Sequence, residues 1–167
     1  IFNGNVYDDA LIKEATEERG LLNLKTTPDA LPCLLEKKNV DMLTSLKVMS
    51  EAEIRSRYEI TLDNYRKAVN IEAQTMVDMA RKEILPAVED YTASLAESLA
   101  AKKAAVPTLS GKYETGLIEK LSGLTDQIAL AVEELESALS DYHKIDDVTD
   151  AAFVIRDVVI PKMETLR

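Results

Sequence analysis

The chain has 167 residues, of which 46% are hydrophobic and 30% charged, with five glycines, five prolines and a formal net charge of −10. This length and composition predict a globular domain, or a domain with an appendage, and argue against a disordered chain. The acidic balance makes nucleic acid and an anionic membrane surface poor partners, because both attract clustered lysine and arginine.

The features that report on cellular compartment are few. Cys33 is the single cysteine, which excludes an internal disulfide bond. No apolar run reaches the roughly 18 residues that a membrane-spanning helix needs, and no signal peptide is visible. We therefore expect a cytoplasmic location. The sequence begins with isoleucine rather than methionine, and we expect it to be part of a longer polypeptide.

The start of the chain predicts a loop or short extended segment, followed by a short helix. Residues 1–7 contain an Asn-Gly turn signal and no clear periodicity. A short helix is expected over residues 8–19, with Asp8 or Asp9 as its cap and Gly20 as its left-handed stop.

An irregular apolar stretch follows, and residues 20–35 read "GLLNLKTTPDALPCLL". Thr27 is expected to cap a helix there, because Pro28 suits a first helical position. The resulting helix, residues 28–36, is short and apolar, so it must be buried against something. Another short helix is predicted over residues 40–48.

Ser50-Glu51-Ala52-Glu53 is a capping box that begins a long helix. Pro86 lies inside this helix and should kink it near Lys82. The mean spacing of its apolar positions is close to the α-helical period, which predicts one buried stripe. The stripe consists of Ile54, Tyr58, Leu62, Tyr65, Val69, Ala73, Met76, Ala80, Ile84, Val88, Tyr91, Leu95 and Leu99.

Two further helices complete the predicted fold. A turn is expected over residues 102–111, and a helix over 112–142 with Leu117, Leu121, Leu124, Ile128, Val132, Leu135, Leu139 and Tyr142 in register. A last helix is expected over 148–164, capped near Asp147 or Thr149 and bending before Pro161. The pattern predicts an all-α fold, an antiparallel bundle of two or three long helices preceded by short helices and a loop. We divide it into a joining segment, residues 1–49, and a helical bundle, residues 50–167.

Candidate catalytic residues are scarce. His143 is the sole histidine and stands at a predicted helix end, where a surface or capping role is expected. Cys33 is expected to be a buried small hydrophobe. One histidine and one distant cysteine support neither a zinc site nor a Cys–His dyad.

The carboxylates of the second long helix are the remaining candidates. Residues 112–150 hold ten acidic side chains against three lysines. Di-metal bundle sites use Glu-x-x-His, which does not occur here. Glu133, Glu134 and Glu136 flank the apolar stripe and are expected to form a solvated acidic face. The basic residues of the first long helix (Arg55, Arg57, Arg66, Lys67, Arg81 and Lys82) are expected to pair with this acidic helix.

Three stretches resemble the C-terminal region of type III glutamine synthetases. They are "IFNGNVYDDALIKEATEERGLLNLKTTPDALPCLLEKKNV" (Ile1–Val40), "SEAEIRSRYEITLDNYRKAVNIEAQTMVDMARKEILPAV" (Ser50–Val88) and "RDVVIPKM" (Arg156–Met163). The resemblance covers the whole chain and is strongest over residues 1–88. The family's "NGSG-H" pattern has no counterpart in residues 3–7, which contain no histidine.

The resemblance implies a non-catalytic fragment of an ATP-dependent glutamate–ammonia ligase. ATP and magnesium would belong to the parent enzyme, so no catalytic, cofactor-binding or metal-binding residue is assigned to this chain. The implied partners are its own catalytic domain and neighbouring subunits of a large ring-shaped homo-oligomer, with a role in assembly or in positioning the catalytic domain. The apolar first segment would then cover a catalytic body.

Two alternatives remain at this stage. The chain could be a free-standing acidic helical module whose stripe binds a partner helix. It could also be a di-metal bundle enzyme that uses Glu133, Glu134 or Glu136, an alternative that the missing Glu-x-x-His disfavours.

Overall fold

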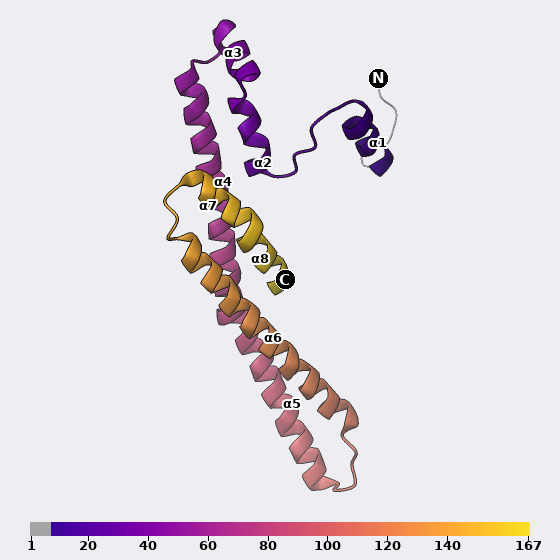
Figure 1. The fold of residues 1–167 in the computed structure, drawn as a ribbon. Coiled ribbons are helices and arrows are strands. Elements are labelled where there is room, and N and C mark those ends of the chain that lie inside the picture. Colours follow the sequence, from indigo (N-terminus) through magenta and orange to yellow (C-terminus); the bar gives the residue numbers. More distant parts are fainter. Residues whose placement is uncertain (1–7) are drawn as a thin grey trace. The chain divides into compact units, whose positions relative to one another are not determined.

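The computed structural model describes residues 8–167, so the loop or extended segment predicted over residues 1–7 lies outside the described part. Every regular element in this range is a helix (Figure 1), which confirms the predicted all-α class. The chain divides into two compact units, Ile1–Leu62 and Asp63–Arg167, with the boundary inside a long helix. The functional division at residue 49 stays a prediction. None of the helices among the described residues is long and apolar enough to cross a membrane.

The first unit begins with short helices. They are α1 (Asp9–Lys13), α2 (Thr27–Ala30) and α3 (Lys37–Ser45). A π-helical turn, Glu14–Glu18, extends α1, and a 3₁₀-helix, Leu31–Leu35, extends α2. The predicted apolar helix is therefore present, with a tighter second half. The helix predicted to begin at residue 40 begins three residues earlier.

Local caps fix the ends of these helices. The Asp8 carboxylate accepts a hydrogen bond at 3.0 Å from the amide two residues later, and Gly20 has a φ of 66°, as predicted. The cap of α2 is Thr26 rather than Thr27, because the helix begins one residue earlier than predicted. The Thr26 hydroxyl accepts from the amide of Asp29 at 3.4 Å.

The predicted capping box is confirmed at the start of the long helix. The Glu53 amide donates to the Ser50 hydroxyl at 3.3 Å, and the Ser50 amide donates to the Glu53 carboxylate at 2.7 Å. These hydrogen bonds, from the Ser50 amide first and its hydroxyl second, hold the pKa of Glu53 below its ordinary value.

The long helix has three parts. It consists of α4 (Glu51–Met79), a π turn (Ala80–Ile84) and α5 (Leu85–Ala105). Proline has no amide hydrogen, and its ring collides with the carbonyl four residues earlier in a regular α-helix. The irregularity predicted near Lys82 is therefore present as a wide turn just before Pro86. The last helix has the same arrangement, with a π turn (Ile155–Val159) that ends two residues before Pro161.

The π turn changes which side chains face inward. Ile84 and Tyr91, both predicted to lie in the buried stripe, are 45% and 53% exposed. Leu85 and Thr92 are half-buried instead. The wide turn accommodates one extra residue, so two inward positions shift along the sequence by one residue. Val88, Leu95 and Leu99 stay at least half-buried, as predicted.

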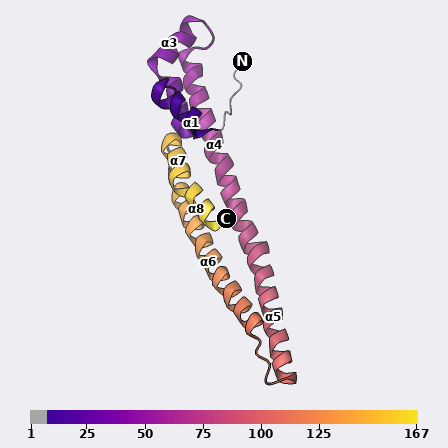
Figure 2. The ribbon, with the colours of Figure 1, turned by 90° about the vertical axis from the view of Figure 1, so that its right-hand side faces the viewer.

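In the second unit, α5 and α6 (Lys112–Tyr142) lie side by side and run in opposite directions (Figures 1 and 2). The bounds of α6 are those predicted. The connecting turn, residues 106–111, is shorter than expected because α5 continues to Ala105. After it come α7 (Val148–Val154), the π turn Ile155–Val159 and α8 (Ile160–Leu166), and this π turn and α8 pack against α6. Asp147 caps α7, since its carboxylate accepts hydrogen bonds from the amides of Thr149 and Asp150, both at 2.9 Å.

A single apolar cluster holds the second unit together. Its buried members come from α4, α6, α7 and the π turns Ala80–Ile84 and Ile155–Val159: Ala73, Val77, Ala80, Val132, Leu135, Ala138, Leu139, Tyr142, Ala151, Ile155 and Val159. Leu124, predicted to face inward, is 43% exposed. The stripe of α6 is therefore buried mainly in its second half, where α7 and α8 cover it.

Gly111 closes the hairpin and is itself buried. It has a φ of 56°, in the left-handed region that favours glycine. A Cβ atom at this position would lie 2.4 Å from a methyl carbon of Leu99. The turn between α5 and α6 therefore depends on the missing side chain for both its backbone conformation and its packing.

Candidate functional site

His143 lies on the surface at the end of α6, which confirms the predicted surface or capping position. Its amide donates to the Leu139 carbonyl at 3.0 Å, and its ring lies 5.1 Å from the ring of Tyr142. The position is set by the helix end, since the imidazole itself is exposed.

The three candidate carboxylates of α6 are directed to ion pairs or to solvent. Glu134 accepts a hydrogen bond from Lys162 of α8 at 2.5 Å, and Glu136 forms an ion pair with Arg81. Glu133 is exposed. The carboxylate of Glu136 raises the pKa of Arg81 by hydrogen bonding and charge. These contacts occupy the carboxylates of Glu134 and Glu136.

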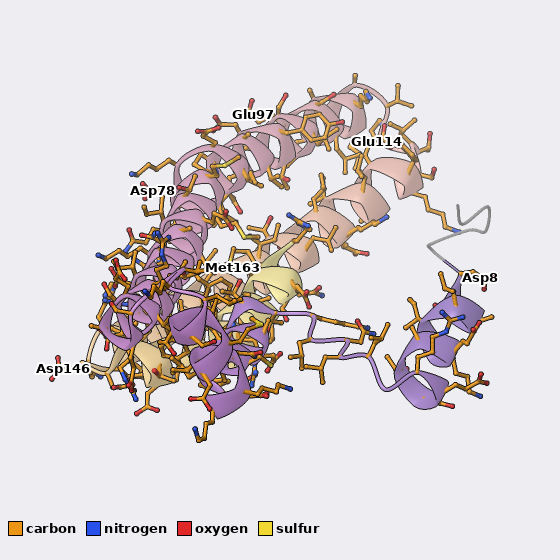
Figure 3. The ribbon with its side chains drawn as sticks, turned by 90° about the horizontal axis from the view of Figure 1, so that it is seen from above. Asp8, Asp78, Glu97, Glu114, Asp146 and Met163 are labelled. Carbon is orange, nitrogen blue, oxygen red and sulfur yellow. The ribbon has the colours of Figure 1, made fainter. Side chains whose placement is uncertain are left out.

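Other carboxylates are spread over the second unit. Asp78, Glu97, Glu114 and Asp146 lie apart, on α4, α5, α6 and the turn before α7 (Figure 3). No group of three or more His, Cys, Asp and Glu residues that could hold a metal ion occurs between residues 8 and 167.

Cys33 is half-buried in the 3₁₀-helix rather than fully buried as predicted. Its carbonyl accepts from the Asn39 side chain at 2.6 Å and from the Glu36 amide at 3.2 Å. The backbone of this residue joins the end of the 3₁₀-helix to α3, so its contribution is to local structure.

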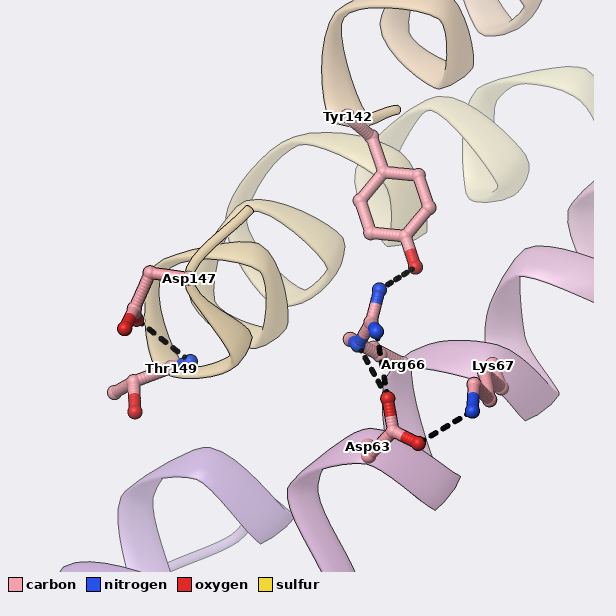
Figure 4. A network of polar contacts seen from close by, with 6 residues as sticks. All are labelled: Asp63, Arg66, Lys67, Tyr142, Asp147 and Thr149. Atoms are coloured by element: carbon pink, nitrogen blue, oxygen red, sulfur yellow. Dashed lines mark hydrogen bonds and ion pairs between the residues drawn. The ribbon is translucent and has the colours of Figure 1, made fainter. Parts of the chain in front are cut away.

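A polar network connects α4 to the end of α6 (Figure 4). Arg66 donates to the Asp63 carboxylate at 2.8 Å and to the Tyr142 hydroxyl at 3.2 Å, and Lys67 pairs with Asp63 at 2.5 Å. The hydrogen bond from Lys67, followed by that from Arg66, holds the pKa of Asp63 below its ordinary value. Tyr142 is almost fully buried, so Arg66 satisfies a hydroxyl that would otherwise be costly to bury.

The expected pairing of the basic first half of the long helix with the acidic second helix is only partly correct. Arg81 reaches Glu136 across the helices. Arg55, Arg66, Lys67 and Lys82 pair instead with acidic residues three or four positions earlier on their own helix, Glu51, Asp63 and Asp78. Residues three or four positions apart already lie side by side on a helix, so these ion pairs form without any packing between helices.

The first unit offers a different kind of candidate, a set of exposed apolar side chains that we call its apolar surface. Only Pro28, Ile54 and Leu62 are buried among residues 8–62. The large hydrophobic side chains that are at least 40% exposed there are Ile12, Leu21, Leu22, Leu24, Met42, Leu46, Val48 and Ile60. Large exposed apolar surfaces usually mark contacts with another protein surface. The burial predicted for residues 28–36 is only partial within the described part of the chain, since Pro28 is buried and Leu31, Leu34 and Leu35 are half-buried.

A comparison with known protein families identifies the chain. The family model described as the glutamine synthetase C-terminal domain matches residues 1–103. The chain belongs to this family. The match includes the described part of the first unit and ends inside α5, so the glutamine synthetase C-terminal domain contains the apolar surface as well as the long helix.

Curated relatives extend the similarity over the whole chain. It is 32% identical over 170 residues to the glutamine synthetase of Butyrivibrio fibrisolvens, which covers 100% of this chain and 24% of that protein. It is 28% identical over 174 residues to the type-3 glutamine synthetase of Dictyostelium discoideum, again over 100% of this chain and 23% of the relative. A glutamine synthetase of Bacteroides fragilis (strain YCH46) is 26% identical over 172 residues, covering 99% of this chain and 23% of that protein.

These relatives confirm the resemblance to the C-terminal region of type III glutamine synthetases. The chain spans about a quarter of the length of the curated relatives it matches. Glutamine synthetases of this kind therefore contain roughly three times as much polypeptide again outside the matched region.

Proposed function

We propose that this chain is the C-terminal scaffold of a larger ATP-dependent glutamate–ammonia ligase, and that it performs no chemistry by itself. The observation that carries the proposal is the family match over residues 1–103, together with relatives of which the chain spans only a quarter. The scaffold would serve in assembly or in positioning the catalytic domain, with its own catalytic domain and neighbouring subunits as partners. ATP and magnesium would bind to the catalytic domain.

The donor groups of the chain support a non-catalytic role. Glu134 and Glu136 are engaged in ion pairs with Lys162 and Arg81, and His143 is a solvent-exposed helix end. By contrast, the exposed apolar surface of residues 8–62 suits a segment that becomes covered when the full ligase folds.

The test compares two proteins. One is the product of the complete reading frame that contains residues 1–167, and the other is residues 1–167 alone. With ATP, magnesium, glutamate and ammonia, we expect glutamine from the first and none from the second. Glutamine formation by residues 1–167 alone would overturn the non-catalytic role. A start codon directly before Ile1 would remove the parent enzyme and favour the free-standing binding module.

A further inference from the structure

Residues 20–25, which we call the leucine loop, present three leucines to solvent. Leu21, Leu22 and Leu24 are 60%, 67% and 40% exposed. The loop connects the π turn after α1 to the cap of α2 and belongs to no helix. It carries the densest group of exposed large apolar side chains among residues 8–62.

The two ends of the leucine loop are held by backbone structure. Gly20 takes the left-handed conformation, and the amide of Leu21 donates to the Ala15 carbonyl at 2.9 Å. At the other end, the side chain of Thr26 caps α2. The loop is therefore a short segment presented between two fixed helix ends, which lowers the entropy cost of binding.

Residues 8–167 leave these three leucines at least 40% exposed. Leucine side chains of this size are strongly stabilised by removal from water, and adjacent exposed ones usually belong to a binding surface. By comparison, Leu135 and Leu139 of the second unit are buried in its core. The leucine loop thus has the composition of a core segment and the exposure of a surface segment.

The proposed parent supplies the occupant. About three quarters of each relative lies outside the matched region, and the matching family model describes a C-terminal domain that includes residue 1. The remaining polypeptide would therefore precede residue 1 and lie close in sequence to the leucine loop.

We propose that the leucine loop docks on the body of the parent ligase that precedes residue 1, with Leu21, Leu22 and Leu24 buried in apolar sites of that body. This inference rests on the proposed function. It assigns the positioning of the C-terminal scaffold to one short segment, within the polypeptide chain rather than between subunits.

A natural probe stands at the end of the leucine loop. Lys25 is exposed and precedes Thr26, so trypsin can cleave the bond between them when the loop is undocked. The rate of this cleavage is measured by mass spectrometry in the complete parent protein and in residues 1–167 alone. Because proteolysis follows the population of the open form, docking should slow the cleavage at least about tenfold in the parent.

A matched pair of triple variants in the parent locates the contact. Changing Leu21, Leu22 and Leu24 to serine should restore cleavage after Lys25 to within about twofold of the rate in residues 1–167 alone. The control changes three exposed leucines of the second unit, Leu109, Leu124 and Leu130, which are 39%, 43% and 58% exposed. In this control the cleavage should stay slow. Amide hydrogen exchange of residues 22–25 in the wild-type parent and in the isolated chain checks the docking without any substitution.

The outcomes separate the docking from the proposed function. Equal cleavage and equal amide exchange in the wild-type parent and the isolated chain would overturn the docking, as would restoration by the control variant. Protection that appears in the isolated chain as its concentration rises would assign the leucine loop to a second copy and overturn the intrachain contact. A wild-type parent that forms glutamine but leaves Lys25 unprotected contradicts the docking alone. A parent with a protected Lys25 and no ligase activity contradicts the proposed function alone.

Discussion

Residues 8–62 and residues 63–167 use the same helical elements in different ways. The second unit buries fourteen apolar residues, and its helices are joined by ion pairs and by the Arg66–Tyr142 hydrogen bond. The first unit buries Pro28, Ile54 and Leu62 within its described part, while eight of its large hydrophobic residues are at least 40% exposed.

The difference shows that helix caps and core packing can act in different parts of one chain. In the first unit, caps at Asp8, Thr26 and Ser50 fix where helices begin, with little tertiary burial behind them. In the second unit, burial of a common cluster determines which helix faces meet. A structure held mainly by caps opens locally at low cost, whereas a packed core unfolds cooperatively.

The largest expected effect comes from the same substitution in the two units. Leu135 is fully buried, so Leu135→Ala should lower the free energy of unfolding by about 2–5 kcal/mol. Leu22 is 67% exposed, and Leu22→Ala should change it by less than about 0.5 kcal/mol. The unfolding free energies of both variants are measured by urea denaturation of residues 1–167, with circular dichroism as the readout. Similar losses for the two variants would show that the leucine loop belongs to a core.

Two left-handed glycines provide a second comparison. Gly111→Ala should cost more than about 2 kcal/mol, because left-handed strain adds to a collision with the buried side chain of Leu99. Gly20→Ala meets no atom within 4 Å, so only the backbone strain of about 1–2 kcal/mol applies. Thermal unfolding should therefore separate the two variants. A Gly111→Ala protein no less stable than Gly20→Ala would mean that Leu99 gives way freely.

The smallest effect concerns acid. The pKa of Asp63 is lowered from 3.8 and that of Glu53 from 4.5. A lowered carboxyl pKa contributes stability that is fully present above the ordinary value and is lost as pH falls through the folded value. Asp63→Asn should therefore flatten the fall in unfolding free energy between about pH 5 and pH 3.

Glu53→Gln is the matched variant in the first unit. It should flatten the acid dependence less, because the start of α4 can fray without opening the core. Equal flattening by both variants would show that the capping box is coupled to global unfolding. Denaturant midpoints measured across this pH range provide the comparison.

The sequence predicts the elements best where the signal is local. The capping box at Ser50, the left-handed stop at Gly20 and the bounds of α6 are confirmed, because each depends on residues within one or two turns. Ile84 and Tyr91 were assigned to the wrong face, because a periodic pattern assumes an uninterrupted α-helix. Pro86 indicated the irregularity but not the inserted residue.

The candidate site could be predicted only in part. The apolar character of residues 20–35 was visible in the sequence, and so was the expectation that it needs a cover. The hydrogen bond between Arg66 and Tyr142 could not be predicted from the sequence. The two residues are 76 positions apart, and only the packing of α4 against α6 brings them together.

The π turns Ala80–Ile84 and Ile155–Val159 also bear on how this chain can change in length. Each accommodates one extra residue just before a proline, so deleting a single residue from Ala80–Ile84 would convert the wide turn into an ordinary α-helical turn. Side chains beyond the deletion would keep their faces, and Leu95 and Leu99 would stay directed inward. A one-residue deletion elsewhere in α4 or α5 would instead rotate every later side chain by about 100°. Among one-residue deletions in the long helix, those in the π turn should therefore disturb the packing of the hairpin least.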